Sequence, residues 1–360
     1  MNSSVESRVV VGMSGGVDSS VAAALLKDQG FDVIGVMLRL WSDVGVENRC
    51  CPPDAQAEAR HIAGQLDIPF YVMDAQTPFY QAVVEPFVDG YAQGFTPNPC
   101  LNCNKFIRWN FLLERAKVLG ASYIATGHYA KIMQDQNGLY QLKKNQDPDK
   151  DQSYFLHVLT QEDLSQTLFP LADLTKSEVR ELANRYKLSV ASRPDSQDLC
   201  FIGQGDYREF LRRTDPTSLK PGAILDKHGN LLGEHTGLAD YTIGQRKGLG
   251  VSGPEPFYVL QKNLTENVLI IGPKKALGRR SFMVDNINWI SGAFPPESIQ
   301  ADIKIRYQSQ PVPGVIRSLE SVRAAITLEK NLPDITPGQA AVFYQEDLCL
   351  GGGTIQWEQI

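Results

Sequence analysis

Short apolar segments alternate with longer amphipathic segments over about the first two hundred residues of the chain. Continuous apolar runs are typical of buried parallel strands, whereas apolar positions spaced every three to four residues are typical of helices. The expected strands are 9–11, 31–41, 69–75 and 122–130, and the expected helices are a segment ending at Gly30, 54–66 and 104–120. Strands and helices in regular alternation predict an α/β fold with a doubly wound parallel sheet.

The pattern changes further along the chain. Two more helical segments, 152–159 and 175–188, precede a region after about residue 210 in which short β-prone runs are separated by glycine-containing turns. From about residue 280 onward the chain is β-prone throughout and is divided by Pro and Gly, which is typical of a small barrel. The expected domains are an α/β domain over 1–210, a small central domain over 211–278 and a C-terminal β-barrel over 279–360.

Length and charge narrow the class of protein. A chain of 360 residues exceeds one ordinary core, in agreement with several domains. The net charge of -6 and the pI of about 5.5 argue against a protein that coats nucleic acid by bulk electrostatics, but leave local basic patches open. The first ten residues contain Glu6 and no apolar run, so a secretory signal and a membrane span are not expected. The expected location is the cytoplasm.

The cysteines indicate chemistry or metal binding. Two of them form a C-x-x-C pair, and a single cysteine follows much later in the segment DLCFI. In a cytoplasmic protein such a pattern favours a reactive or metal-binding site over a framework of disulfides. The six cysteines are Cys50, Cys51, Cys100, Cys103, Cys200 and Cys349.

The segment VVVGMSGGVDSS, from Val9 to Ser20, joins the first predicted strand to the first predicted helix. A glycine-rich turn at this place lets backbone N–H groups and the positive end of the helix dipole approach a phosphate. The segment is no Walker A loop, because Gly-Lys-Ser/Thr is missing, and it lacks the G-x-G-x-x-G of dinucleotide-binding turns. A turn without a ligand is the alternative interpretation.

The motif SGGVDSS resembles the pyrophosphate loop of ATP pyrophosphatases. These enzymes have an adenine nucleotide alpha hydrolase-like fold and cleave ATP to AMP and pyrophosphate. Five further motifs resemble those of the bacterial tRNA-specific 2-thiouridylase family in order and approximate spacing. They are GFTPNPCLNCNKFIRW, ATGHYA, KDQSYFL, DSQDLCFI and YTIGQRKGLG. The resemblance covers essentially the full length. It implies an ATP-dependent sulfurtransferase that makes 2-thiouridine at the wobble position of tRNAs for Lys, Glu and Gln.

This chemistry requires three steps. The uridine oxygen must become a leaving group, which adenylation by ATP achieves; a sulfur nucleophile must replace it; and the sulfur must then leave the protein. The resemblance implies that Cys200 carries a persulfide and that Cys103 is the nucleophile that attacks it, leaving a disulfide. These two residues lie 97 positions apart, so only the fold can bring them together. The sulfur donor would be a cysteine desulfurase or a sulfur-relay protein.

Cys100 departs from the pattern of the family, in which many members have Asp at this position. That Asp is thought to act as a general acid or base beside the target uridine. Cys100 would serve as a proton shuttle, as an additional sulfur-handling thiol, or with Cys103 and Cys200 as a ligand of an iron–sulfur cluster. A zinc site is also compatible, although a fourth ligand is not evident. No resident metal is assigned, and the metal-free persulfide route is preferred; the remaining cysteines are interpreted as structural or incidental.

The resemblance also assigns contacts with ATP. The loop would hold the phosphates, and Asp18 would bind a Mg²⁺ ion. Leu38 would contact the adenine, and Gly127 would lie beside the ribose or adenine. The alternative for Leu38 is that it is only a residue of the hydrophobic core. His128 is either a catalytic base or a loop histidine. The expected ATP-binding residues are Gly12, Met13, Ser14, Gly15, Gly16, Val17, Asp18, Ser19, Leu38 and Gly127.

For tRNA, the target base must leave its stack to reach the cysteines, and an Arg-Tyr pair offers a guanidinium and an aromatic plane to RNA. The expected tRNA-binding residues are Asn98, Pro99, Cys100, Lys150, Asp151, Gln152, Arg306 and Tyr307. Further contacts with tRNA are expected from a basic track, although each of its members could instead belong to a solvated charged face. The track comprises Lys105, Arg108, Arg246, Lys247, Lys274, Lys275, Arg279 and Arg280.

Two other functions fit parts of this pattern. An amide- or amidine-forming synthetase would use the same ATP loop without a persulfide. A non-catalytic tRNA-binding protein would keep RNA binding with a vestigial loop. The intact SGGVDSS and the three cysteines 100, 103 and 200 favour the sulfurtransferase.

Overall fold

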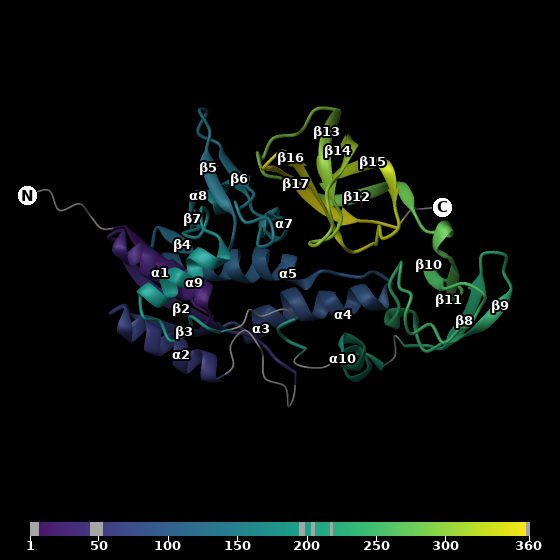
Figure 1. Cartoon of the computed structure of the whole chain (residues 1–360), viewed down its shortest axis with the longest axis horizontal. Coiled ribbons are helices and arrows are strands. Elements are labelled where there is room, and N and C mark those ends of the chain that lie inside the picture. The colour runs from purple at the N-terminus through teal and green to yellow at the C-terminus, as the bar shows by residue number, and fades with distance from the viewer. Residues whose placement is uncertain (1–6, 44–52, 194–198, 203–205, 217–218, 358–360) are drawn as a thin grey trace, which may run out of the picture.

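The computed structural model describes residues 7–43, 53–193, 199–202, 206–216 and 219–357. Cys50, Cys51 and residues 195–198 of the DSQDLCFI motif lie outside them. Figure 1 shows a first α/β region, a barrel beside it, and a smaller sheet beyond the barrel. No helix of the described residues is long and apolar enough to cross a membrane.

The α/β region is built on a five-stranded parallel sheet. Its strands are β1 (Arg8–Gly12), β2 (Asp32–Arg39), β3 (Phe70–Asp74), β4 (Tyr123–Ala125) and β7 (Thr167–Leu168), in the order β3-β2-β1-β4-β7. The predicted doubly wound parallel sheet is therefore confirmed. The predicted strand at 122–130 is shorter than expected, because the backbone after Ala125 turns into the loop of Gly127 and His128.

Helices cover both faces of this sheet, which explains why β1 is apolar without alternation. Val9 and Val11 face a core with helices α1 (Val17–Asp28), α2 (Pro53–Gln65) and α9 (Lys176–Arg185). Val10 faces the opposite core, which includes Trp109 and Leu112. The order of the strands reverses between β1 and β4, and the crevice outside the carboxyl ends of the strands at such a point is where doubly wound sheets bind ligands.

The helix predicted at 104–120 begins earlier than expected. Asn98 accepts a hydrogen bond from the backbone N–H of Cys100 (3.2 Å) and Pro99 takes the first helical position, both of which favour a helix start. The helical rod then comprises α5 (Pro99–Asn102), a π-helical stretch η2 (Cys103–Phe111) and α6 (Leu112–Val118).

Further helices surround this rod. An unpredicted helical run before it consists of α3 (Gln76–Phe79), η1 (Tyr80–Val84) and α4 (Glu85–Ala92). The helix predicted at 152–159 is reduced to α7 (Ser153–Leu156), followed by α8 (Gln161–Ser165). Capping boxes at Thr160 and Thr175 begin α8 and α9, as their Asp and Glu three residues later favour.

The C-terminal strands close into a barrel, as predicted. They are β12 (Arg279–Trp289), β13 (Ser298–Lys304), β14 (Val312–Glu320), β15 (Arg323–Leu332), β16 (Ala340–Gln345) and β17 (Leu348–Ile355). The antiparallel order β12-β15-β14-β13-β16-β17 returns to β12, around a core that includes Ile303, Ile326 and Phe343. A hairpin of β5 (Lys131–Gln134) and β6 (Tyr140–Lys143) from the α/β region adds to the edge of β17.

The smaller sheet has its own core. Its strands are β8 (Gly222–Asp226), β9 (Leu231–His235), β10 (Phe257–Asn263) and β11 (Val268–Pro273), in the order β10-β11-β8-β9, with the short turns η4 (Leu238–Asp240) and η5 (Lys274–Ala276). Ile224, Val259 and Ile271 are fully buried within it. Helix α10 (Tyr207–Thr214) precedes this sheet but packs its Phe210 and Leu211 into the α/β region.

A buried lysine joins the small sheet to the α/β region. Lys262 of β10 is 4% exposed and donates to the backbone oxygen of Gly94, just after α4, at 3.2 Å. Burial lowers the pKa of Lys262 to about 7, well below the value of about 10.4 for a solvated lysine. The unfolded chain therefore binds more protons between these two values, so the free energy of unfolding should rise with pH from about 7 to 10.

We expect Lys262→Met to raise the melting temperature near pH 7 by about 3 °C or more, because the charged amine no longer has to be desolvated. Thermal unfolding measured at pH values from neutral to 9 should also show a smaller rise with pH than in the wild type. Lys227→Met, at an exposed lysine of the β8–β9 turn, is the control. A lower melting temperature of Lys262→Met at every pH would mean that the bond to Gly94 outweighs the burial of charge.

Candidate active site

Two predicted ATP-binding segments meet in the crevice between β1 and β4. Gly12 ends β1, and Gly127 follows β4 in the loop ATGHYA. A Cβ atom built on Gly127 would lie 2.6 Å from the backbone carbon of Asp18 and from the backbone nitrogen of Ser19. Glycine at 127 therefore lets the ATGHYA loop pack directly on the first turn of α1.

The glycine-rich loop has the backbone expected of a phosphate site. Gly15 has a φ of 70°, in the left-handed region, and a Cβ on it would lie 2.4 Å from the carbonyl oxygen of Ala55 in α2. The N-cap of α1 is Gly16, whose absent side chain leaves the first backbone N–H groups uncapped. Hydroxyl groups brace the turn: Ser20 donates to the oxygen of Gly16 (2.8 Å), and the N–H of Ser14 donates to Ser19 Oγ (3.2 Å).

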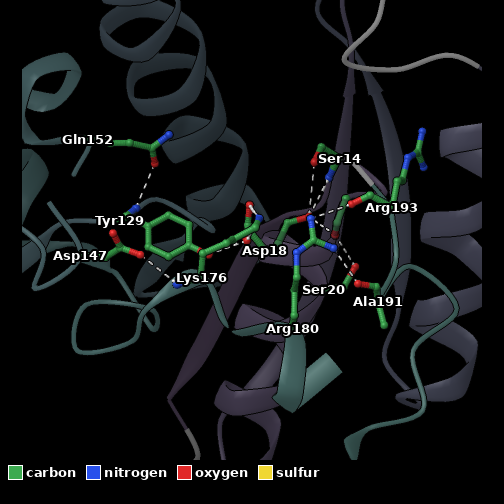
Figure 2. Close-up of polar contacts among 12 residues, drawn as sticks. Ser14, Asp18, Ser20, Tyr129, Asp147, Gln152, Lys176, Arg180, Ala191 and Arg193 are labelled. Atoms are coloured by element: carbon green, nitrogen blue, oxygen red, sulfur yellow. Dashed lines mark hydrogen bonds and ion pairs between the residues drawn. The ribbon is translucent and has the colours of Figure 1, made fainter. Parts of the chain in front are cut away.

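Asp18, in the first turn of α1, is held by two residues from other elements (Figure 2). Lys176 Nζ lies 2.7 and 2.9 Å from the two carboxylate oxygens, and the hydroxyl of Tyr129 donates to Oδ1 at 2.7 Å. Lys176 is the first residue of α9, and its backbone N–H donates to Asp147 at 3.1 Å. The arrangement places an ammonium group, a carboxylate and a phenol beside the uncapped helix start.

Lys176 and Tyr129 were not predicted from the sequence as partners of Asp18. Lys176 lies in the TKSEVR segment, in which Thr175 and Glu178 indicate a helix start but no binding site. Tyr129 is inside a recognised motif, but nothing in its spacing relates it to Asp18, 111 residues earlier. Their function depends on where α9 and the loop after β4 return to the sheet.

Two arginines connect the phosphate loop to the segment that leads to Cys200 (Figure 2). Arg193 donates to the backbone oxygen of Gly15 at 2.8 Å. Arg180 of α9 donates to the backbone oxygens of Ala191 (2.8 Å) and Arg193 (3.0 Å), which holds this segment in place. The chain before Cys200 is therefore bonded directly to the loop that would bind phosphate.

Cys103 and Cys200 pack against one hydrophobic cluster. Phe201, beside Cys200, is 1% exposed, and its ring centroid lies 5.9 Å from that of Phe79 and 5.4 Å from that of Phe87. Cys200 and Cys103 are both partly buried against this same cluster. The rings of Phe79 in α3 and Phe87 in α4 thus anchor Phe201, the neighbour of Cys200, in the cluster.

Cys100 lies one helical turn before Cys103, so both thiols project from neighbouring positions of the same helical rod. Cys100 is exposed, whereas Cys103 is partly buried. Among the residues that the structure describes, no three His, Cys, Asp or Glu side chains gather as a metal site would require.

Leu38 and His128 flank the crevice. Leu38, near the end of β2, is partly buried against the hydrophobic clusters on both sides of it. The Nδ1 atom of His128 lies 2.6 Å from the hydroxyl oxygen of Thr126, and the ring packs near Trp109 and Phe169. Burial and the nearby Arg108 lower the pKa of His128 to about 3, so the ring is neutral at physiological pH and a weak base.

The segments predicted to bind tRNA lie side by side. Tyr307, in the barrel, packs on Phe155, three residues after Gln152, with ring centroids 4.5 Å apart. Gln152 accepts a hydrogen bond from the backbone N–H of Tyr129 (3.0 Å), which links this surface to the phosphate loop. Lys150 is partly exposed, and Arg306 is partly buried, its guanidinium bonded to Thr336 at 2.7 Å.

Asp151, by contrast, is only 5% exposed. It accepts hydrogen bonds from the backbone N–H groups of Asn145 and Ser153 and from the hydroxyl of Ser153, at 2.9 to 3.1 Å. Its side chain therefore holds the loop that presents Lys150 and Gln152. Of the proposed basic track, all but Arg108 are exposed.

Comparisons with known proteins agree with this architecture. Three family models match: a tRNA methyl transferase HUP domain at 7–204, a tRNA methyl transferase PRC-barrel domain at 208–273 and an aminomethyltransferase beta-barrel domain at 279–355. Among solved structures, NMN synthetase from Francisella tularensis is 20% identical with a TM-score of 0.36 over 60% of this chain and 79% of that chain, a likeness too weak to argue from.

Curated relatives match nearly end to end. The tRNA-specific 2-thiouridylase MnmA of Natranaerobius thermophilus is 46% identical over 98% of this chain and 98% of the relative. The protein of the same name from Geotalea uraniireducens is 47% identical over 97% of this chain and 95% of the relative. At this identity and coverage, the chain belongs to the tRNA-specific 2-thiouridylase family.

Proposed function

We propose that this protein is an ATP-dependent tRNA-uridine 2-sulfurtransferase that acts in the cytoplasm on the wobble uridine of tRNAs for Lys, Glu and Gln. One observation carries the proposal. Arg193 connects a phosphate-binding loop to the segment that leads to Cys200, and Cys200 shares a hydrophobic cluster with Cys103. These contacts support placing the proposed ATP loop and the two proposed sulfur-handling cysteines in one packed region.

The loop and its neighbours suit the phosphates of ATP. The left-handed Gly15 and the uncapped start of α1 offer N–H groups to an anion, and Lys176 adds a positive charge. Asp18 is the carboxylate suited to hold Mg²⁺, which would neutralise phosphate charge. Because Lys176 now pairs with Asp18, magnesium binding at Asp18 would release the ammonium group toward the phosphates.

The sulfur steps use the two partly buried thiols. The C2 oxygen of uridine attacks the α-phosphorus of ATP and pyrophosphate leaves. The terminal sulfur of a persulfide on Cys200 then attacks C2 and AMP leaves. Cys103 thiolate attacks Cys200 Sγ, the sulfur–sulfur bond breaks toward the new thiouridine, and a Cys103–Cys200 disulfide remains. An external reductant restores the thiols, and a cysteine desulfurase or sulfur-relay protein reloads Cys200.

Cys100 is placed to serve beside this pair. Its exposure and its position one turn from Cys103 suit a proton shuttle at the target base or an additional sulfur-handling thiol. The neighbouring Asn98 and Pro99 shape the helix start that presents it, and Lys150, Gln152, Arg306 and Tyr307 form the adjoining surface for tRNA, with Asp151 supporting it from below.

The test is to incubate the protein with unmodified tRNA, ATP, Mg²⁺, cysteine and a cysteine desulfurase, and to analyse the nucleosides by mass spectrometry. We expect 2-thiouridine under aerobic and anaerobic conditions alike. Formation only without oxygen and with iron would assign Cys100 to a cluster instead. A methylated nucleoside, or tRNA binding without any modified product, would overturn the proposal in favour of methyl transfer or of a binding protein.

Gly127→Ala tests the junction between the ATGHYA loop and α1. The added methyl group would collide with the backbone of Asp18 and Ser19, neither of which can yield as a flexible side chain would. We expect the KM for ATP to rise by about tenfold or more, with little change in the affinity for tRNA. Gly64→Ala, at a helical glycine of α2 whose Cβ would meet nothing within 4 Å, is the control. An unchanged KM would show that ATP does not depend on this junction.

A further inference from the structure

A second cavity lies outside the residues used above for ATP and sulfur. Its volume is about 600 Å³, within the range of small-ligand sites, and it is lined by α10, the YTIGQRKG segment 241–248 and the barrel residues Arg306 and Asp334. All three regions of the molecule contribute to it. The YTIGQRKG motif, singled out in the sequence, has no part in the chemistry proposed above.

The walls of this cavity carry more positive than negative charge. Four cationic side chains, Arg208, Arg212, Lys247 and Arg306, line it, against the carboxylates of Asp240 and Asp334. Arg212 pairs with Asp240 at 2.8 Å, and Arg306 lies 3.5 Å from Asp334. Lys247 is exposed at the rim. Arg208 also pairs with Asp206 at 2.9 Å, so the surplus is one positive charge, which favours an anionic ligand.

A buried acceptor at this site has no hydrogen-bond partner among the residues that the structure describes. Asp240 is 4% exposed, and its Oδ2 atom accepts hydrogen bonds from Arg212 (2.8 Å) and Thr236 (2.7 Å). Its Oδ1 atom has no hydrogen bond within the described residues. A buried carboxylate oxygen left unpaired is unfavourable, so a donor on a ligand would be bound with a gain in free energy.

A nucleotide meets these demands together. It combines a phosphate for the cationic groups with a ribose hydroxyl or a base N–H for Asp240, and its base can lie against Tyr207 or Tyr241, which also line the cavity. We propose that this cavity binds one unstacked nucleotide of the tRNA substrate, away from the nucleotide that is thiolated. The inference rests on tRNA as substrate, as argued under Proposed function.

The test compares Lys247→Ala with Lys227→Ala, two exposed lysines of the same region of which only Lys247 lines the cavity. We expect Lys247→Ala to weaken tRNA binding by about fivefold and to lower the slope of log Kd against log salt by about one, with Lys227→Ala close to wild type. Acylation of ribose 2′-hydroxyl groups should show one tRNA nucleotide that is protected in the complex with the wild type and reactive in the complex with Lys247→Ala.

Three results would overturn the inference. The first is that the two variants bind tRNA with equal affinity. The second is that Lys247→Ala protects the same ribose 2′-hydroxyl groups as the wild type. The third is that Lys247→Ala weakens binding of free AMP and leaves tRNA binding intact, which would assign the cavity to a free nucleotide. Each is read in a preparation whose wild type makes 2-thiouridine. Absence of that product in the wild type would instead overturn the proposed function, so the two failures are distinguishable.

Discussion

Cys200→Ser is expected to lower the rate of 2-thiouridine formation by at least about a thousandfold, because a serine hydroxyl cannot carry the sulfur that replaces the uridine oxygen. Binding of tRNA and ATP should be kept, since Phe201, not Cys200, anchors this segment in the hydrophobic cluster. The measurement is the thiolated nucleoside per enzyme, together with mass spectrometry of the protein after incubation with the desulfurase. The extra sulfur atom on residue 200 should be absent.

Two further cysteine variants sharpen this experiment. Cys103→Ser should still accept sulfur on Cys200 and transfer it to C2, but should fail to release it, so that a disulfide-linked adduct of Cys200 with tRNA accumulates while free 2-thiouridine does not. Cys349→Ala is the matched control: this thiol is 1% exposed in the barrel, and burial raises its pKa to about 12, so it is unreactive. Thiolation by Cys200→Ser at a rate near wild type would refute the persulfide route.

Lys176→Met should reduce ATP-dependent thiolation by about two to three orders of magnitude, because one positively charged donor aimed at the phosphates is removed. The variant also leaves Asp18 without the cation that now neutralises it, which places an unbalanced carboxylate beside bound phosphate. We expect a higher KM for ATP as well as a lower kcat. Lys176→Arg should recover part of the activity, since it restores the charge with a different shape.

Lys131→Met is the control for this variant, because Lys131 forms a comparable ion pair with Asp173 (2.7 Å) on the surface of the same region. Sulfur loading of Cys200 by the desulfurase needs no ATP and should be unaffected by Lys176→Met, which separates loss of the ATP site from loss of the fold. If Lys176→Met thiolated tRNA as Lys131→Met does, Lys176 would have no part in ATP binding.

The residues close in sequence were the predictable part of the site. The strand, glycine turn and helix from Arg8 to Asp28 follow from buried β-branched residues, from the left-handed glycine and from an apolar helix face, all of which are local properties. The C-x-x-C spacing likewise places Cys100 and Cys103 on neighbouring positions of one helix, whatever the rest of the fold. The predicted helix was too short at its N-terminal end, because Asn98 was not recognised as its N-cap residue.

Contacts between distant residues were not predictable by physical reasoning on the sequence. No local pattern relates Lys176 to Asp18, since the ion pair depends on α9 and α1 packing on the same face of the sheet. The β5–β6 hairpin was missed as part of the barrel sheet because its pairing partner, β17, lies some two hundred residues later. The pairing of Cys103 with Cys200 was implied by resemblance alone.

The parallel sheet, the glycine-rich turn after its first strand and the C-terminal barrel could be predicted from the amino-acid sequence, because each follows from the order of polar and apolar residues within single elements. The contacts of Lys176 and Tyr129 with Asp18, the bond of Arg193 to the glycine-rich loop and the packing of Phe201, Cys200 and Cys103 on one cluster became visible in the folded structure alone. These relations arise when separate elements bury their apolar faces together, and that packing brings side chains into contact irrespective of their distance along the chain.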